Sequence, residues 1–277
     1  SRQFEARPGL LVEEHYTDTD IVYFAEGKNA SISVRRGDGY VGLRTNGKVD
    51  ASNGQDMTTQ LMIAYLPGFH HPSPENVLVI GYGSGVTAGA AAAFPEVVRV
   101  DCVEIEPAVV AAGPWFDDVN RRSYDHPKVN IIEGDARNYL NISDQTYDII
   151  ISEPSNPWIA GIGSLFTAEF YERAAAALND DGIFAQWVQL YELSPEDVRM
   201  ILAEFERQFP EVTVWDMGVG DLVLLGSRQP LVMDVERMDR IIGTDPTVEK
   251  DFREHLLLDD PLGILAHYVM PVERVRE

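Results

Sequence analysis

Short apolar runs and turn signals alternate through the first fifty residues of the chain. Four pieces have the hydrophobic pattern of β-strands, at residues 10–16, 20–26, 30–36 and 40–45. The turns between them include an Asp-Gly pair at 38–39 and an Asn-Gly pair at 46–47, and both pairs tolerate the positive φ of a tight hairpin. The pattern predicts a small antiparallel β domain over residues 1–54.

From residue 55 onward, helical and strand-like segments alternate. Residues 55–67 have helical character, and we expect Pro67 and Gly68 to end this helix. Residues 76–81 form a short, almost entirely apolar run, which is typical of a parallel strand buried on both faces. Further strands are expected at residues 97–106, 128–135, 147–153 and 182–189, and helices at 86–93, 107–116, 136–140, 167–178 and 194–209. Thr167 and Ser194 are candidate N-caps for the last two helices.

This alternation predicts a doubly wound α/β sheet. Two further strands, at residues 212–217 and 221–227, flank a pair of glycines and predict a closing antiparallel hairpin. That order of elements is the order of the Rossmann-like methyltransferase fold, which we expect over residues 55–228. Residues 229–277 are predicted to form a C-terminal helical extension.

The composition narrows the class of ligand. The 277 residues include 45 acidic and 22 basic side chains, for a formal net charge of −23. Nucleic acid is excluded as a partner, because its binding needs a basic surface. The acidic balance suits a small cationic substrate, although solubility alone would also account for it.

The single cysteine, Cys102, lies inside an apolar run and excludes an intrachain disulfide framework. A buried, inert thiol is expected, which fits a reducing compartment and therefore a cytoplasmic location. No apolar segment approaches the ~18 residues needed to span a bilayer. Because the chain begins at Ser1, it can also be the cytoplasmic part of a longer, membrane-attached protein.

Candidate binding residues gather where the predicted strands end, since open parallel sheets bind ligands beyond the carboxyl ends of their strands. Gly81, Gly83 and Gly85 follow the first such strand and would let a ligand approach the backbone closely. Glu104 ends the next strand, where a carboxylate can accept the hydroxyl protons of a ribose. Asp135 ends the third and can meet an adenine amino group or cap the next helix. Together these loops predict a nucleoside site.

The fourth strand ends in Glu153, followed by Pro154. The proline restricts the residue before it to extended conformations, so the carboxylate is aimed by a stiff backbone. Beside a nucleoside, such a group can orient a cationic amine or remove its proton. The competing interpretation is a rigid turn with Trp158 packed over it.

The four loops together resemble the polyamine aminopropyltransferases, the spermidine synthase family, over about residues 10–228. The catalytic loop of that family reads Asp-Ser-Ser-Asp-Pro, followed by Ser-Leu-Phe; here "EPSNP" at 153–157 and "SLF" at 164–166 match in register. The loop also resembles a divergent bacterial subgroup that is often joined to membrane-spanning segments. The resemblance implies a transferase that moves an aminopropyl group from decarboxylated S-adenosylmethionine to an amine and releases methylthioadenosine.

The resemblance assigns roles to residues of this chain. It implies Glu153 as the catalytic base and a homodimer as the assembly. The nucleoside substrate would be held by Gly81, Gly83, Ser84, Gly85, Glu104, Ile105, Asp135 and Ala136. The amine acceptor would be held by Asp50, Asp56, Gln60, Tyr82, Asn156 and Trp158.

Several positions depart from the family pattern, and nearly all of them concern the amine. Glu153 and Asn156 replace the two aspartates of the catalytic loop, and Ser84 replaces the aspartate of the glycine loop. Thr59 and Gln60 stand where the family has a Tyr-His pair, and Asp50 where it has a gate glutamine. The nucleoside half of the site is therefore kept and the amine half is rewritten.

Two alternative functions stay open at this point. One is methyl transfer from S-adenosylmethionine itself, and the other is a non-catalytic domain that binds a nucleoside or polyamine. No metal is expected, because His70 and His71 have no third ligand nearby in the sequence. A hydrolase is excluded because residues 83–85 lack the full Gly-x-Ser-x-Gly elbow.

Overall fold

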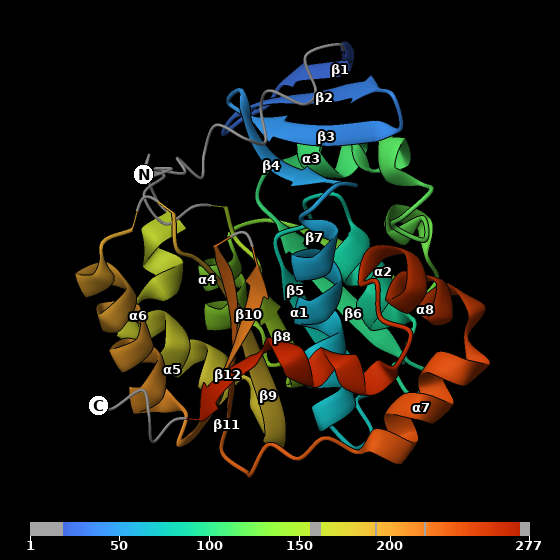
Figure 1. The fold of residues 1–277 in the computed structure, drawn as a ribbon. Coiled ribbons are helices and arrows are strands. Elements are labelled where there is room, and N and C mark those ends of the chain that lie inside the picture. Colours follow the sequence, from blue (N-terminus) through green and yellow to red (C-terminus); the bar gives the residue numbers. More distant parts are fainter. Residues whose placement is uncertain (1–18, 156–161, 192, 219, 272–277) are drawn as a thin grey trace, which may run out of the picture.

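The computed structural model describes residues 19–155, 162–191, 193–218 and 220–271, and it contains two β-sheets. The smaller sheet lies above the larger one, which is flanked by helices (Figure 1). The smaller sheet is antiparallel, in the order β1-β2-β3-β4. Its strands are β1 (Asp20–Glu26), β2 (Ser31–Gly37), β3 (Tyr40–Thr45) and β4 (Lys48–Ser52).

The predicted antiparallel β domain is thus confirmed in its described part. Both hairpin turns form as expected, with positive φ at Asp38 (47°), Gly39 (79°), Asn46 (51°) and Gly47 (86°). Strand β4 was not among the predicted pieces, and the piece expected at residues 10–16 lies outside the described residues.

The larger sheet has the order β12-β10-β11-β9-β8-β5-β6-β7. Strands β5 to β9 are parallel to one another, whereas β11 pairs antiparallel with both β9 and β10, and β12 pairs antiparallel with β10. The expected doubly wound sheet with a closing hairpin is therefore confirmed. Its strands are β5 (Asn76–Ile80), β6 (Arg99–Glu104), β7 (Val129–Glu133), β8 (Tyr147–Ser152), β9 (Leu178–Gln189), β10 (Glu211–Gly218), β11 (Asp221–Ser227) and β12 (Tyr268–Pro271).

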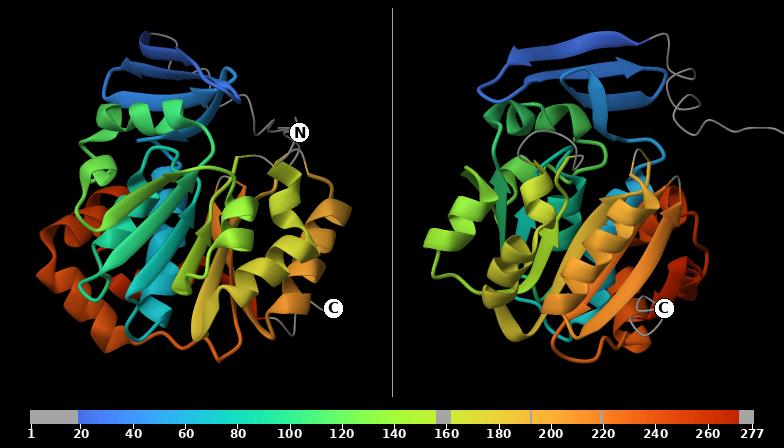
Figure 2. Two further views of the ribbon diagram at one scale, coloured as in Figure 1. Left: turned by 180° about the vertical axis from the view of Figure 1, so that it is seen from behind. Right: turned by 90° about the vertical axis from the view of Figure 1, so that its left-hand side faces the viewer.

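Helices cover both faces of this sheet, as the two further views show (Figure 2). Successive strand residues point to opposite faces, so Val77 and Val79 pack with α1, α2 and α7, and Leu78 and Ile80 pack with α5 and α6. The helices are α1 (Met57–His70), α2 (Val86–Ala92), α3 (Pro107–Ala111), α4 (Ala136–Ile142), α5 (Ala168–Ala176), α6 (Pro195–Gln208), α7 (Val235–Thr244) and α8 (Pro246–Lys250). Short 3₁₀ segments are η2 (Gly113–Phe116), η3 (Ser123–Asp125), η4 (Ile162–Phe166) and η6 (Pro261–His267), and η5 (Asp251–His255) is a π-helical turn.

Helix α1 does not end at Pro67 and Gly68, so that prediction was wrong. The helix continues to His70, and its last turn is closed by the His71 N–H, which donates to the Pro67 carbonyl at 2.9 Å. Gly68 is required by packing, because a Cβ there would lie 2.1 Å from the Phe94 ring. Burial of nearly the whole helix outweighs the local preference of these two residues to break it.

The two predicted N-caps are confirmed. The Thr167 hydroxyl accepts a hydrogen bond from the Phe170 N–H at the start of α5. Ser194 and Asp197 form a reciprocal capping box at the start of α6.

The C-terminal segment contributes more than helices. Its last strand, β12, extends the large sheet beyond β10, which the sequence did not predict. The Arg237 side chain of α7 is buried, pairs with both Glu96 carboxylate oxygens at 3.0 and 3.1 Å, and donates to the Gly68 carbonyl at 2.7 Å. This segment is therefore packed against α1 and the residues that follow α2.

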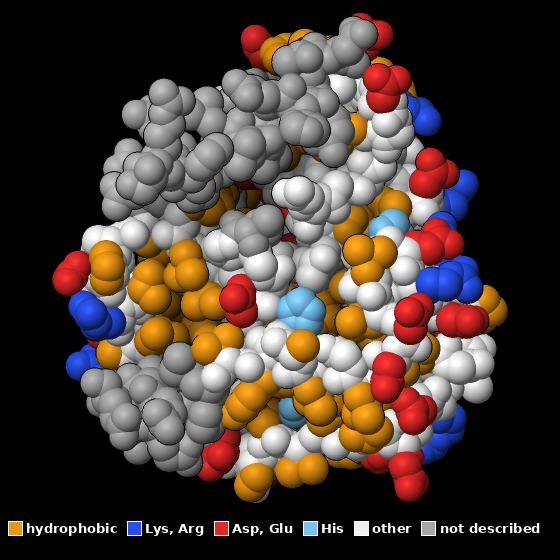
Figure 3. Space-filling model, viewed as in Figure 1, with side chains coloured by type: hydrophobic (Ala, Val, Ile, Leu, Met, Phe, Trp, Pro, Cys, Tyr) orange, Lys and Arg blue, Asp and Glu red, His pale blue; other side chains and the backbone are white. Residues whose placement is uncertain are grey.

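Within the described residues, no helix is long and apolar enough to cross a membrane. On one face of the molecule, hydrophobic side chains gather over α6 and the stretch from η6 to β12, and acidic side chains follow the opposite edge (Figure 3). Cys102 is fully buried, as expected.

Candidate active site

A cavity of about 560 Å³ lies between the small sheet and the carboxyl ends of β5, β6, β7 and β8. Most of the residues proposed for the nucleoside, and two of those proposed for chemistry or the acceptor, line it. These are Gly81, Gly83, Glu104, Ile105, Asp135, Ala136, Asp50 and Glu153. The strand ends predicted to form one site therefore do meet in space.

The glycine loop and Glu104 are joined by hydrogen bonds. One carboxylate oxygen of Glu104 accepts the Tyr82 N–H at 2.8 Å, and the other accepts the Glu106 N–H at 2.8 Å. Each oxygen keeps a second lone pair, which is available to a ligand hydroxyl. Burial raises the pKa of Glu104, although these backbone donors oppose the rise. The carboxylate is thus held in one orientation at the wall of the cavity.

Gly81 brings the glycine loop into direct contact with the loop that carries Glu153. Its φ is +93°, and a Cβ at this position would lie 2.5 Å from the Glu153 carbonyl oxygen. The Glu153 N–H also donates to the Ile80 carbonyl at 3.0 Å. The glycine loop and the loop that carries Glu153 are therefore held backbone to backbone.

Asp135 is the N-cap of α4 and also lines the cavity. Its carboxylate accepts the Arg137 N–H at 2.8 Å and the Asn138 N–H at 3.3 Å. Partial burial alone would raise its pKa, but the Arg137 side chain and the two backbone donors lower it overall.

Glu153 faces the cavity from the end of β8. Its carboxylate accepts a hydrogen bond from the Thr87 hydroxyl of α2 at 2.5 Å. Burial, together with the negative charges of Asp56 and Asp221, raises its pKa to about 8 despite that hydrogen bond. A carboxyl with such a pKa can exchange a proton near neutral pH, as a general base must.

Four of the proposed residues lie behind the cavity wall. The Ser84 hydroxyl donates to the Gln60 side chain, whose amide in turn donates to the Ser52 carbonyl at 2.8 Å and to Asp56 at 3.1 Å. Tyr82 is buried, with its hydroxyl 3.0 Å from Ser123 Oγ, so its position does not support a place in the acceptor wall.

One further proposed residue belongs to the glycine loop. Gly85 precedes the first turn of α2, with φ at +83°, so its contribution is to the backbone of the loop. Asn156 and Trp158 lie outside the described residues.

The small sheet supplies a wall that the sequence did not predict. Lys28, Asn29 and Thr45 all line the cavity. The Asn29 N–H donates to Glu106 at 2.8 Å, and its side chain donates to the Ile105 carbonyl at 2.9 Å. Residues 27–29 lie between the strands predicted at 20–26 and 30–36, but their position over the cavity depends on how the two sheets pack.

Two further features join the walls of the cavity. Asp50 of β4 accepts a hydrogen bond from the Ser155 hydroxyl at 2.8 Å, which ties the small sheet to the loop carrying Glu153. Trp187 of β9 lines the cavity and also packs against the hydrophobic core.

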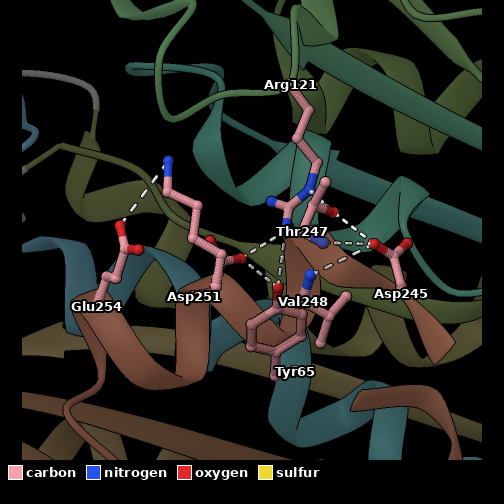
Figure 4. A network of polar contacts seen from close by, with 8 residues as sticks. Tyr65, Arg121, Asp245, Thr247, Val248, Asp251 and Glu254 are labelled. Carbon is pink, nitrogen blue, oxygen red and sulfur yellow. Dashed lines mark hydrogen bonds and ion pairs between the residues drawn. The ribbon is translucent and has the colours of Figure 1, made fainter. Parts of the chain in front are cut away.

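Residues 120–123 support the glycine loop from behind. The Asn120 side chain, fully buried, donates to the Ser84 and Gly113 carbonyls, both at 2.9 Å. The next residue, Arg121, has a positive φ of 55°. Its guanidinium forms a buried ion pair with Asp251 of η5 and donates to the Tyr65 hydroxyl at 3.1 Å (Figure 4). The C-terminal segment thereby holds this strained support in place.

One cluster with the composition of a metal site lies at the opposite ends of the strands. His71, Asp148 and Asp181 offer ligand atoms within 4.8 Å of one another, so the expectation of no third ligand near His71 was wrong. However, His71 Nδ1 accepts the Ser73 N–H at 3.2 Å, which leaves the proton on Nε2, 3.7 Å from Asp181. Asp148 already accepts two backbone N–H groups and the Asn179 amide. Asp148 in this cluster is therefore satisfied by hydrogen bonds, whereas His71 Nε2 is buried and has no hydrogen-bond partner among the described residues.

A doubly wound sheet closed by an antiparallel hairpin, with a glycine loop and an acidic residue at adjacent strand ends, defines the Rossmann-like methyltransferase fold class. Within that class the family is also clear. The sequence profile of the spermine/spermidine synthase domain matches residues 57–217, and the chain belongs to this family.

Individual relatives agree with this assignment. The chain is 31% identical to a spermidine synthase of Dictyostelium discoideum, over 61% of this chain and 60% of the relative. It is 29% identical to a polyamine aminopropyltransferase of Bacillus cytotoxicus, over 64% of each. The chain thus spans less than two thirds of the length of these curated relatives.

Solved structures show the same fold at lower identity. A spermidine synthase in complex with the transition-state analogue AdoDATO superposes with a TM-score of 0.77 at 20% identity, over 92% of this chain and 87% of that chain. The spermidine synthase of Thermotoga maritima gives 0.75 at 20% identity, over 92% and 86%.

Proposed function

We propose that the chain is an aminopropyltransferase that moves an aminopropyl group from decarboxylated S-adenosylmethionine to an amine and releases methylthioadenosine. The observation that carries this proposal is the position of Glu153, which faces the same cavity as the glycine loop and Glu104. A nucleoside held by Glu104 and residues 134–136 would place its sulfonium near the glycine loop. The attacking amine would then lie beside Glu153.

The reaction needs alignment and one proton acceptor. The amine nitrogen forms a bond to the methylene next to sulfur, the carbon–sulfur bond breaks, and its electron pair neutralises the sulfonium. The proton lost by the ammonium goes to Glu153. A free alkylammonium has a pKa near ~10.4, and the burial that raises the pKa of Glu153 would lower that of the amine. Alignment of the two substrates in one cavity lowers the activation free energy of the transfer by several kcal/mol.

Activity is expected to rise with pH through about 8, because only the ionised Glu153 can accept the proton. The group whose deprotonation activates the enzyme has a raised pKa, so activity is lost below that pKa and retained above it. A profile of kcat/KM between pH 6 and 9 measures this inflection. A profile that is flat between pH 6 and 9, as expected for a carboxyl with the ordinary glutamate pKa of ~4.3, would contradict the role.

Replacing Glu104 with glutamine is expected to weaken methylthioadenosine binding about 10- to 100-fold, since hydrogen bonds to a charged group contribute ~1.5–3 kcal/mol. The matched control is Glu133→Gln, which removes an exposed carboxylate from the paired position at the end of β7. Isothermal calorimetry should show normal affinity for the control. Equal affinities for both variants would contradict the ribose role of Glu104.

Methyl transfer from S-adenosylmethionine is the second candidate, and Ser84 is the observation that favours it. The glycine loop offers no carboxylate for the aminopropyl nitrogen, and the Ser84 hydroxyl is turned toward Gln60. Calorimetry with both sulfonium compounds separates the candidates. Tighter binding of the decarboxylated compound supports aminopropyl transfer, and tighter binding of S-adenosylmethionine supports methyl transfer.

Assembly and location belong to the same proposal. We propose a homodimer in the cytoplasm with a small cationic amine as the partner, which the family resemblance implies and the acidic composition suits. No metal takes part in the proposed reaction.

A further inference from the structure

The Glu106 carboxylate is shared between the two parts of the molecule. Glu106 is 4% exposed and is the N-cap of α3, where its Oε1 accepts the Ala108 N–H at 3.2 Å. Its Oε2 accepts the Asn29 N–H at 2.8 Å, and Asn29 lies in the turn between β1 and β2 of the small sheet. Burial alone would raise the pKa of Glu106, but the N–H groups of Asn29, Ala108 and Ala30 lower it overall. The group is therefore an ionised carboxylate with one oxygen bonded to each part.

The turn at residues 27–30 fits closely against this carboxylate. A Cβ at Gly27 would lie 2.2 Å from the carboxylate carbon of Glu106, so only glycine lets the turn come so near. The neighbouring strand β1 adds a further contact, because the Tyr23 hydroxyl donates to the Ala108 carbonyl at 3.1 Å. Figure 1 shows α3 directly beneath the small sheet. The small sheet is therefore fastened to the large one at and around Glu106.

Glu106 also reaches the nucleoside side of the cavity. Its N–H donates to Glu104 Oε1 at 2.8 Å, and Glu104 is the carboxylate proposed to hold the ribose. Lys28, Asn29 and Ala30 of the turn line the same cavity as Glu104 and Glu106. A shift of Glu106 would therefore move a wall of the cavity and turn the ribose carboxylate at the same time.

We propose that Glu106 is a positioning residue for the nucleoside: it holds the turn at residues 27–30 over the cavity and thereby sets the affinity for methylthioadenosine. It acts through Asn29 and Glu104, and it takes no part in the transfer of the proton or the aminopropyl group. This inference rests on the proposed function, because it concerns the same nucleoside site. A turn that is already held in place keeps the cavity in its binding shape, which lowers the free-energy cost of binding.

The test measures methylthioadenosine binding to the full chain by calorimetry, which gives the dissociation constant and the number of binding sites separately. Glu106→Asp keeps a charged N-cap for α3 but is one methylene too short to reach Asn29. It should raise the dissociation constant about 10-fold at an unchanged number of sites, since hydrogen bonds to a charged group contribute that much or more. A merely destabilised chain would lose sites at an unchanged dissociation constant. The matched control, Glu26→Asp, shortens an exposed carboxylate beside the same turn and should bind as wild type does.

Gly27→Ala tests the same contact from the side of the small sheet. The φ of Gly27 lies outside the left-handed region, so alanine fits the backbone there and only its methyl group meets Glu106. This variant should also raise the dissociation constant about 10-fold. In the Glu106→Asp background it should add little, because the shortened carboxylate has withdrawn from the methyl group. The control is Gly243→Ala, where a Cβ would meet no described atom within 4 Å.

The outcomes separate this inference from the proposed function. If Glu106→Asp and Gly27→Ala bind methylthioadenosine as tightly as the wild type, the inference is overturned and the proposed function stands. Additive effects, with about 100-fold weaker binding in the double variant, would overturn it as well, because the two residues would then act independently. If the wild type itself does not bind methylthioadenosine, the proposed function fails and the inference fails with it.

Discussion

Glu153→Gln is expected to lower turnover by about 100- to 10,000-fold, the usual contribution of a positioned general base, while methylthioadenosine affinity stays nearly unchanged. Glutamine has the same shape and can still accept the Thr87 hydrogen bond, but it cannot take a proton from the amine. The nucleoside contacts at Glu104 and residues 134–136 are untouched. Single-turnover kinetics and calorimetry measure the two quantities separately.

The same substitution should make the protein more stable above pH 4.5. Glu153 has a raised pKa of about 8 in the folded state, so the unfolded state gains free energy by ionising first as the pH rises. The gain in stability of the variant should be near zero at pH 4.5, grow by at most ~1.4 kcal/mol per pH unit, and level off above pH 8. Urea unfolding at pH 5 and pH 8 measures it. Unchanged turnover, or a variant less stable than wild type at pH 8, would contradict the assigned role.

The second large effect concerns the Arg121–Asp251 ion pair. Asp251→Asn is expected to lower the free energy of unfolding by about 3–5 kcal/mol, because it leaves the buried Arg121 guanidinium without its countercharge. Arg121 is a non-glycine residue with a positive φ, which is a strained backbone conformation. Contacts such as this ion pair therefore hold its backbone in place. Urea denaturation at neutral pH measures the change.

The matched control for this prediction lies in the same network. Glu254→Gln removes a carboxylate paired with Lys250 at 3.9 Å, with both side chains 47% exposed. Exposed pairs contribute ~0–1 kcal/mol, so the control should stay close to wild type. If Asp251→Asn also stays within about 1 kcal/mol of wild type, the buried pair does not stabilise the fold as argued.

The grouping of the strand ends around the cavity was predictable because it depends on local sequence. A strand that is apolar on both faces ends where polar residues begin, so Gly81, Glu104, Asp135 and Glu153 were recognisable as strand ends. Parallel strands bring such ends to one edge of a sheet. Family resemblance then gave these residues roles, and the cavity they line agrees with the predicted grouping.

The features that the sequence did not predict depend on contacts between segments that are distant in the chain. Lys28 and Asn29 reach the cavity only because the small sheet packs over the large one, and no local pattern encodes that packing. Asp221 begins an ordinary apolar strand, and its neighbours Thr59 and Gln189 are 162 and 32 residues away. Strand β12 and the continuation of α1 through Pro67 have the same cause, since tertiary burial outweighs local preference.

The most direct test of the central claim is product analysis. The full chain is incubated with decarboxylated S-adenosylmethionine and 1,4-diaminobutane, and the products are identified by mass spectrometry. We predict methylthioadenosine and an amine heavier by one aminopropyl group, in equal amounts and dependent on Glu153. Absence of methylthioadenosine with every amine tested, or transfer of a methyl group from S-adenosylmethionine in its place, would contradict the proposed function.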